Sequence, residues 1–302
     1  MMDASYVPIM LRPGWVLERY YGWSIVHETA ALKLLRKDRG PVRKFLLLAR
    51  NASDDEISDA AFRHGLLRPL SFVVLNDFSS RSEEESRIVG GVCYRRATTS
   101  RWFGVGTFVL DLSENLDILL ARMPPKERSN CRQAERLGVK VEFIAQPGDE
   151  DIKEFFALYK KMARERSLAG PRRDILQQMF AGRDLLMIRS IDSRGLSLAF
   201  NLVYLQGDQG CLLYSVRADG QSGGAGRYAH WETMKKLKAE GFRWYDLGLV
   251  ASRDNSDGIY WFKRSFGGEF VDFGREYQHI PRGLAIAYRT FRALRQRLGK
   301  VL

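Results

Sequence analysis

Runs of apolar residues along the first half of the chain predict an ordered mixture of strands and helices. Short apolar runs bounded by polar or turn residues predict strands, and apolar residues recurring every three or four positions predict helices. We expect strands at 45–50, 71–77, 87–97, 106–112 and 139–145, and helices at 54–67, 113–123 and 125–138. A Gln-Pro-Gly-Asp-Glu-Asp segment then breaks the pattern, so we place a domain boundary near residue 147.

The second half repeats this mixture around a glycine-rich segment. We expect helices at 149–167 and 173–180, strands at 184–192, 196–205 and 210–219, a glycine-rich loop, a helix ending at Gly241, a strand at 242–247, a short aromatic helix at 258–266 and a strand at 269–277. The last residues, 281–302, place apolar side chains on one helical stripe and carry basic but no acidic residues. This pattern predicts a terminal helix that docks through its apolar stripe. The basic residues on the opposite face of this helix are either exposed to solvent or in contact with phosphates or a membrane surface.

Composition narrows the class of protein. The chain has 302 residues and a formal net charge of +12, a length that suggests two domains and a charge that favours polyanionic partners. The first residues contain no leader-like apolar run, and no run is long enough to span a membrane. The three cysteines lie far apart without metal-binding spacing, so we expect no structural zinc, no disulfide framework and a cytoplasmic protein.

A glycine-rich motif lies between the last central strand and the following helix. Residues 221–226 read Gln-Ser-Gly-Gly-Ala-Gly and fit the pattern Q-x-x-G-x-G at Gln221, Gly224 and Gly226. In acyltransferases of the GNAT type, such a loop directs backbone N–H groups and a helix N-terminus at the pyrophosphate of acyl-CoA. The order of strands, loop, helix and strand is also typical of that fold. The alternative interpretation of this short motif is a flexible connection.

A more specific resemblance lies in the second half of the chain. The segment Tyr-Asp-Leu-Gly-Leu at 245–249, followed after a polar loop by Gly-Ile-Tyr-Trp-Phe-Lys-Arg-Ser-Phe-Gly-Gly at 258–268, resembles the end of Fem-type proteins. Residues 107–143 are similar to the mid-chain block of the same family, in which a strand ending in Asp-Leu precedes an Arg-rich helix and a further strand. The resemblance covers residues 107–280, whereas residues 1–106 share only the order of elements.

The resemblance implies an α/β fold of two GNAT-like domains. Each would be a mixed, mostly antiparallel sheet flanked by helices, with a cleft between the domains. The N-terminal domain would span residues 1–146 and the C-terminal domain residues 147–280. In this family the C-terminal helix, here 281–302, returns to the first domain. The helical arm that some members insert is absent here, which indicates the compact subtype.

The resemblance also implies an aminoacyltransferase. Such an enzyme takes an amino acid from charged tRNA, without a bound cofactor, and forms an amide on an amine-bearing acceptor. The acceptor would be a cell-wall precursor, which requires work at the inner face of the membrane, or a small molecule, which does not. The alternative is an N-acyltransferase that uses acyl-CoA and acts on an amino sugar or an amino acid. We expect a monomer in either case.

Two residues are implied as catalytic. In Fem-type transferases the Lys of the Phe-Lys pair, here Lys263, lies at the reacting carbonyl or at the tRNA end. Asp246 would orient the attacking amine or pair with Lys263. Because an aminoacyl ester is already activated, the enzyme must mainly position the amine and stabilise an oxyanion. The alternatives are a surface lysine beside a core phenylalanine and a buried aspartate that only accepts hydrogen bonds.

The family also places acceptor-binding residues on the strand before the glycine-rich loop. The substrate-binding residues implied by the resemblance are Tyr214, Arg217, Tyr260, Phe262 and Gly258. A core role for Tyr214 remains open.

For the phosphates of tRNA or CoA we expect Gln221, Gly224, Gly226, Arg128 and Arg132. The arginines recur every fourth residue and share a helix face, which a solvated surface would explain equally well. His230 follows the glycine-rich loop and is a candidate acid or base.

Overall fold

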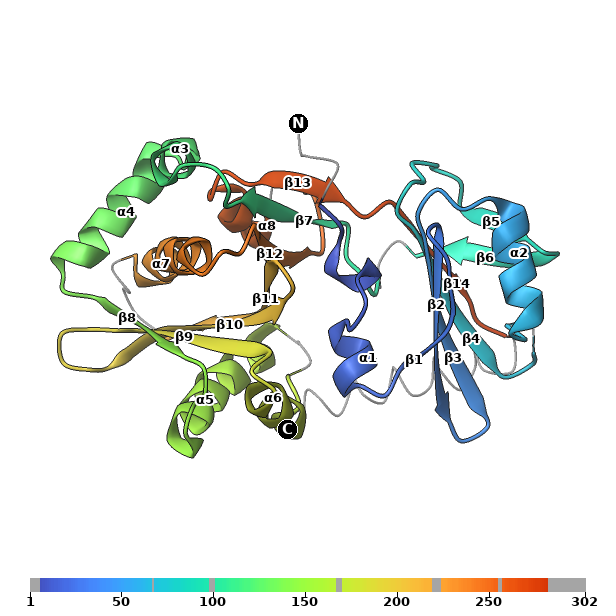
Figure 1. Ribbon diagram of the computed structural model, residues 1–302, viewed down its shortest axis with the longest axis horizontal. Helices are drawn as coiled ribbons and strands as arrows, with labels where there is room; N and C mark the ends of the chain where they lie inside the picture. The colour runs from blue at the N-terminus through green and yellow to red at the C-terminus, as the bar shows by residue number, and fades with distance from the viewer. Residues whose placement is uncertain are drawn as a thin grey trace. The chain divides into compact units, whose positions relative to one another are not determined.

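The chain forms two compact units, each built on one seven-stranded sheet (Figure 1). The N-terminal unit contains residues 10–106 and 249–253 together with those from 272 on, and the C-terminal unit contains the residues up to 9, 107–248 and 254–271. The computed structural model describes residues 6–66, 68–97, 101–166, 170–218, 224–254 and 257–281. Residues 282–302 of the expected terminal helix lie outside the described residues.

The sheet of the N-terminal unit has the strand order β1-β2-β3-β4-β14-β6-β5. Its strands are β1 (Ser24–Glu28), β2 (Leu32–Arg39), β3 (Val42–Ala49), β4 (Ser71–Asp77), β5 (Ser86–Val89), β6 (Val92–Arg96) and β14 (Arg275–His279). The strands β3 and β4 are parallel, and α2 (Asp54–Arg63) connects them. A short 3₁₀ helix, η1 (Ile9–Leu11), and α1 (Val16–Tyr20) precede β1.

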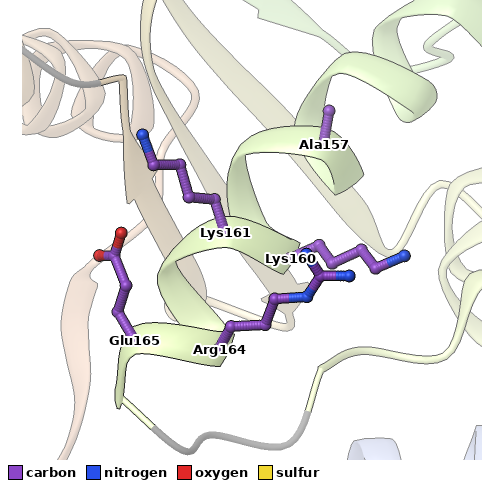
Figure 2. A pocket seen from close by; sticks show the side chains of 5 residues that line it. All are labelled: Ala157, Lys160, Lys161, Arg164 and Glu165. Carbon is purple, nitrogen blue, oxygen red and sulfur yellow. The ribbon is translucent and has the colours of Figure 1, made fainter. Parts of the chain in front are cut away.

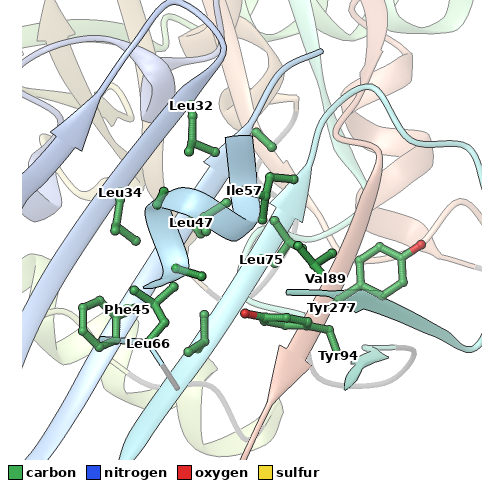
Figure 3. Packing of buried hydrophobic residues seen from close by; sticks show 14 residues of the cluster. Leu32, Leu34, Phe45, Leu47, Ile57, Leu66, Leu75, Val89, Tyr94 and Tyr277 are labelled. Atoms are coloured by element: carbon green, nitrogen blue, oxygen red, sulfur yellow. The ribbon is translucent and has the colours of Figure 1, made fainter. Parts of the chain in front are cut away.

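Helix α2 is fixed at its start and along one face. The Ser53 hydroxyl accepts a hydrogen bond from the Glu56 N–H (3.2 Å), and the Glu56 carboxylate accepts one from the Ser53 N–H (2.8 Å), which is a capping box. The buried residues Ile57, Ala60 and Ala61 then pack against the sheet. Figure 3 shows the resulting core, which includes Leu32, Leu34, Phe45, Leu47, Leu66, Leu75, Val89, Tyr94 and Tyr277. This core anchors the crossover between the parallel strands.

The sheet of the C-terminal unit has the strand order β13-β7-β12-β11-β10-β9-β8. Its strands are β7 (Gly106–Asp111), β8 (Lys140–Ile144), β9 (Leu185–Ile191), β10 (Ser197–Gln206), β11 (Gln209–Arg217), β12 (Trp244–Val250) and β13 (Glu269–Asp272). Its helices are α3 (Leu116–Arg122), α4 (Pro125–Arg136), α5 (Asp149–Arg166), α6 (Arg173–Ala181), α7 (Ala225–Ala239) and α8 (Gly258–Arg264).

Helices cover both faces of this second sheet. In Figure 1, α4 and α7 lie over one face, and α5 and α6 lie over the other. On the α5 side, the Phe155 ring packs edge-on against Phe200 of β10, with ring centroids 6.2 Å apart. On the α7 side, Ala225 joins Ala134 and Val139 in a buried apolar cluster. The sheet is thus buried between two helical layers.

The two sheets share one connectivity. In the N-terminal unit, β2 and β3 pair antiparallel, α2 crosses over, and β4 returns parallel to β3. In the C-terminal unit, β10 and β11 pair antiparallel, α7 crosses over, and β12 returns parallel to β11. The expected fold, an α/β class with two GNAT-like domains of mostly antiparallel strands, is therefore confirmed.

Two expected strands are each divided in the structure. The strand expected at 87–97 is the hairpin β5–β6, because Gly90 and Gly91 adopt positive φ angles of 58° and 76° and reverse the chain. The strand expected at 269–277 is β13 and β14, which lie in different sheets. A turn at Gly274 (φ 70°) separates them. The strands β1 and β2, which the pattern did not predict, complete the first sheet.

The units divide the chain at a different place from the expected boundary. We expected residues 107–146 in the first domain, but these residues cluster with the C-terminal unit. The reason is the pairing of strands, because β7 lies between β13 and β12, and β8 pairs antiparallel with β9. The polar Gln-Pro-Gly-Asp segment is therefore a connection within this unit.

Among the described residues, no helix combines the length and apolarity that crossing a bilayer requires.

The turn at Gly274 gives a test of the route that carries the chain from β13 to β14. A Cβ at this position would overlap the carbonyl oxygen of Asp77 and lie 2.8 Å from its carbonyl carbon. Gly274→Ala should therefore lower the free energy of unfolding by about 3 kcal/mol or more, because backbone must move in addition to the strain at positive φ. The measurement is the shift in the urea midpoint.

The matched control is Gly22→Ala, since Gly22 has a similar φ of 65° but no atom within 4 Å of its Cβ position. This variant should lose only about 1–2 kcal/mol. Equal losses in the two variants would contradict the close approach of the Gly274 turn to β4.

Candidate functional site

Asp246 lies at the centre of a buried polar cluster in the C-terminal unit. It occupies β12 and is 2% exposed. One carboxylate oxygen accepts hydrogen bonds from the Gly248 N–H (2.7 Å) and from the Thr107 hydroxyl. The other accepts from the Tyr6 hydroxyl (2.7 Å) and, at 3.4 Å, from the Gln209 amide. Burial raises the pKa of Asp246, and these hydrogen bonds together with the charge of Lys263 counteract the rise.

Lys263 lies close to this carboxylate. It belongs to α8, a short helix whose N-terminus is capped by Asp257, which accepts a hydrogen bond from the Ile259 N–H (2.8 Å). Burial lowers the pKa of Lys263 to about 8, while the negative charge of Asp246 acts in the opposite direction. The ammonium group is therefore still mostly protonated at neutral pH, but it can lose its proton slightly above it.

Gly248 makes room for this pair. Its φ is 77°, and a Cβ there would overlap the carbonyl oxygen of Leu212 and lie 3.6 Å from the Lys263 Nζ. The regular parallel register between β11 and β12 includes only three residue pairs and ends at Cys211–Asp246. Asp246 is thus the last residue of β12 in regular register with β11. The Lys263 nitrogen lies near Gly248, two residues farther along the strand.

An aromatic cluster borders the lysine. His230 of α7 is 1% exposed, and its Nδ1 lies 2.8 Å from the Tyr245 hydroxyl. Its ring lies 5.6 Å from Phe262 and 4.8 Å from Phe266 between centroids. Burial and the charge of Lys263 lower the pKa of His230 to about 3. The imidazole is therefore neutral at physiological pH and fixed in a packed environment.

The other residues expected on α8 differ in exposure. Tyr260 is buried and packs against Phe108 with ring centroids 5.3 Å apart. Phe262 is partly buried, and the Arg227 guanidinium lies 5.3 Å from its ring centroid. Gly258 is the exposed first residue of the helix. The aromatic residues of α8 hold the helix against the sheet and so fix the position of Lys263.

The two residues expected on β11 lie toward its C-terminal end. Tyr214 is partly buried and makes an edge-on contact with Tyr159 of α5, with ring centroids 5.6 Å apart. Arg217 is exposed and pairs in register with Ala199 of β10. Both follow the point at which β11 stops pairing with β12.

The arginines of α4 do not act alike. The Arg128 guanidinium donates hydrogen bonds to the carbonyl oxygens of Met123 (2.7 Å) and Ala121 (3.0 Å), which satisfies the C-terminal end of α3. Arg132 is exposed on the helix surface. Of these two arginines, Arg132 presents its side chain to solvent in the manner of a phosphate contact.

The glycine-rich motif ends at the start of α7. Gly224 has φ 86°, and a Cβ there would lie 2.9 Å from the carbonyl carbon of Asn130, so the close packing of α4 on α7 requires a glycine. Gly226 has no atom within 4 Å of its Cβ position, which leaves the first turn of α7 open on that side. Gln221 lies outside the described residues.

Three residues of the Asp246 cluster were missed by reasoning from the sequence. Tyr6, Thr107 and Gln209 come from distant segments, and the Tyr6–Asp246 hydrogen bond joins positions 240 residues apart. Tyr6 and Gln209 belong to no motif, and Thr107 is the first residue of the 107–143 block, in which nothing singles it out. In the described residues, no group of three or more His, Cys, Asp or Glu side chains could hold a metal ion.

Comparisons with known proteins show which folds this chain is similar to. Residues 125–264 match the profile of the acetyltransferase (GNAT) domain. The structure is similar to FemX, with a TM-score of 0.60 and 13% identity, covering 92% of each chain. It is also similar to the C-terminal domain of an Agrobacterium fabrum protein described as a lysylphosphatidylglycerol synthetase, with a TM-score of 0.57, 13% identity and coverage of 91% of this chain and 89% of that one.

A third similar structure is a tandem GNAT protein from the clavulanic acid biosynthesis pathway. Its TM-score is 0.50 at 14% identity, over 83% of this chain and 80% of that one. A search of curated protein sequences gave no match. At these identities the likeness concerns the fold. The resemblance to Fem-type proteins that the motifs indicated is confirmed at this level.

The electrostatic coupling between Asp246 and Lys263 can be tested by Asp246→Asn. Removing the negative charge should lower the pKa of Lys263 below 8, because burial is then opposed only by the smaller effects of Cys211 and Asp257. The titration is followed through the ¹³Cε resonance of Lys263, assigned by its absence in Lys263→Arg. The variant should also lose about 1–3 kcal/mol of stability, since an amide cannot accept from all the donors that face Asp246.

Thr107→Val is the matched control. It removes one hydrogen bond to Asp246 and leaves the charge in place, so the pKa of Lys263 should move much less than in Asp246→Asn. An unchanged titration of Lys263 in Asp246→Asn would contradict the coupling.

Proposed function

We propose that the protein is an aminoacyltransferase that takes an amino acid from its ester on tRNA and forms an amide on an amine-bearing acceptor. The observation that carries the proposal is the partly buried Lys263, with its pKa lowered to about 8, beside the buried Asp246 carboxylate. A cation in a site of low dielectric is suited to stabilising an oxyanion. Aminoacyl-tRNA is then a co-substrate, and no cofactor stays bound.

The chemistry needs little more than positioning. The acceptor amine attacks the ester carbonyl and forms a C–N bond, and the carbonyl oxygen becomes an oxyanion beside the Lys263 ammonium. The intermediate collapses by breaking the C–O bond to the ribose of the tRNA. The ribose oxygen takes up a proton and the amine loses one, so charge and protons balance.

Asp246 acts on this reaction through Lys263. Because its oxygens already accept from Thr107, Gly248 and Tyr6, it is a positioning residue that keeps the lysine charged and in place. Tyr214 and Arg217 follow it on the neighbouring strand and bind the acceptor, and Arg217 supplies a guanidinium for a carboxylate or phosphate.

One further observation supports tRNA as the donor carrier, and another supports an amino acid as the transferred group. The net charge of +12 suits a polyanionic substrate. The similar structures include FemX and a protein described as a lysylphosphatidylglycerol synthetase, and the latter name describes the attachment of an amino acid to a lipid.

The second candidate is an N-acyltransferase that uses acyl-CoA. The start of α7 favours it, because Gly226 leaves the first turn open and this turn contains no acidic residue. A helix N-terminus of this kind attracts phosphate groups. The match of residues 125–264 to the acetyltransferase domain supports the same candidate.

Incubation with charged tRNA distinguishes the two candidates. We expect a mixture of total aminoacyl-tRNA and candidate amines to give an acceptor heavier by one amino acid residue, detected by intact mass. Acetyl-CoA should give no product. Total tRNA should also raise the melting temperature, while CoA at micromolar concentration should not. Stabilisation and product formation with CoA alone would favour the second candidate.

The pH profile tests the role of Lys263. As the required cation, it must keep its proton, so kcat/KM should fall as the pH rises through about 8. Lys263→Arg retains a cation that does not titrate in this range and should lose the fall, at a reduced rate. Lys263→Met should lose about 100-fold or more in kcat.

The profile is measured between pH 6.5 and 9, with spontaneous ester hydrolysis subtracted. A rise in kcat/KM through pH 8 that disappears in Lys263→Arg would show that the neutral amine acts as a base, contrary to the proposed role.

A further inference from the structure

The outer face of α5 carries a basic hollow. The helix buries Ile152, Phe155 and Tyr159 against the sheet. On its exposed side lies a hollow of about 350 Å³, which Figure 2 shows. Its lining residues are Ala157, Lys160, Lys161, Arg164 and Glu165. We refer to these five residues as the α5 hollow.

The spacing of these residues explains why they share one face. They follow one another at intervals of one and three positions, so they recur with the helical period and project from the same side. All five are exposed. Three of them are cations and one is an acid, which gives the hollow a positive balance.

Most of the acidic residues of α5 lie away from this face. Asp149, Glu150 and Asp151 are in the first turn, where Lys153 forms an ion pair with Glu150, and Glu165 is the one acid among the lining residues. Within the described part of the chain, Lys160 and Arg164 form no ion pair. A polyanion could therefore bind both side chains without first breaking a salt bridge.

We propose that the α5 hollow binds the sugar-phosphate backbone of the tRNA donor. This inference rests on the proposed function and assigns the contact for the body of that substrate. The cations are one turn apart along the helix, and successive phosphates along an RNA strand can engage such a row. Each cation that neutralises a phosphate releases a counterion, which drives binding at low salt.

The composition of the face favours RNA over a lipid surface. A helix that binds a bilayer presents large apolar side chains beside its cations. In the described residues, no exposed large hydrophobic side chain lies on α5.

The hollow is connected to the reaction site through α5 itself. Tyr159, on the inner face of the helix, contacts Tyr214 of β11, and the lining residues Lys160 and Lys161 follow directly. The outer face would thus hold the body of the donor, while residues on the sheet side contact the acceptor.

A binding experiment tests the site. The affinity of the full chain for total tRNA is measured as a function of salt for the wild type, Lys160→Gln/Arg164→Gln and the control Lys153→Gln. The double variant should bind about 5–10-fold more weakly at low salt, and its slope of log K against log salt should be smaller by about 1–2. The control lies on the same helix and removes the same kind of charge, so it should stay within about twofold.

In the second part of the experiment, the binding of the same variants to phosphatidylglycerol vesicles is measured. If the double substitution weakens vesicle binding and leaves tRNA binding unchanged, the face binds lipid and the inference is wrong. A loss of binding free energy in the Lys153→Gln control that is half or more of the loss in the double variant would also overturn it, because the control removes half as many charges and the effect would then reflect net charge alone.

An activity experiment separates this inference from the proposed function. Full-length aminoacyl-tRNA is compared with an aminoacylated RNA hairpin that contains only the acceptor end. The double variant should raise KM for the full-length donor, with a several-fold smaller effect for the hairpin. If the wild type transfers from neither donor, the proposed function fails while the binding result stands. If it transfers from both and the variant leaves KM for each unchanged, the α5 hollow is not the contact.

Discussion

The pairing of the partly buried Lys263 with the buried Asp246 carboxylate is the constraint on which the site depends. Withdrawing two charges from water costs several kcal/mol per ion, and their attraction offsets this only when the remaining hydrogen-bonding capacity is satisfied. Asp246 meets this condition through donors from Tyr6, Thr107 and Gly248. The lysine keeps a pKa of about 8 because this fixed carboxylate opposes the effect of burial.

This requirement explains why the C-terminal unit includes more of the chain than the expected boundary gave it. Thr107 is on β7, which lies beside β12 in the sheet, and Tyr6 comes from the very start of the described chain. A unit that began at residue 147 would lack both donors and leave the Asp246 carboxylate buried with fewer partners. The position of β7 between β13 and β12 therefore has a second role, because it brings the Thr107 hydroxyl to the Asp246 carboxylate that pairs with Lys263.

The sequence predicted what is local and missed what is distant. Helix α8 with Lys263 and the order of strands around α7 follow from periodicity and contiguous motifs, and the fold agrees. The donors to Asp246 could not be predicted, because a hydrogen bond across 240 residues leaves no local pattern. The every-fourth-residue spacing of Arg128 and Arg132 placed them on one face, but a phosphate contact and the capping of α3 produce the same spacing. Whether Arg128 caps α3 or faces solvent depends on where α3 ends, which the spacing of the arginines does not show.

The positive charge of the chain is unevenly available to a partner. In the N-terminal unit, arginines are held by carboxylates: Arg96 and Arg275 share Glu83, and Arg87 lies between Asp54 and Asp77. The cations in the second half of α5 also complement the negative end of the helix dipole, but this effect is confined to the last turn and worth less than about 1 kcal/mol. It accounts for the positive charge at Arg164 and not for Lys160 and Lys161 one turn earlier. Local geometry, rather than the net charge, therefore decides where a polyanion can bind.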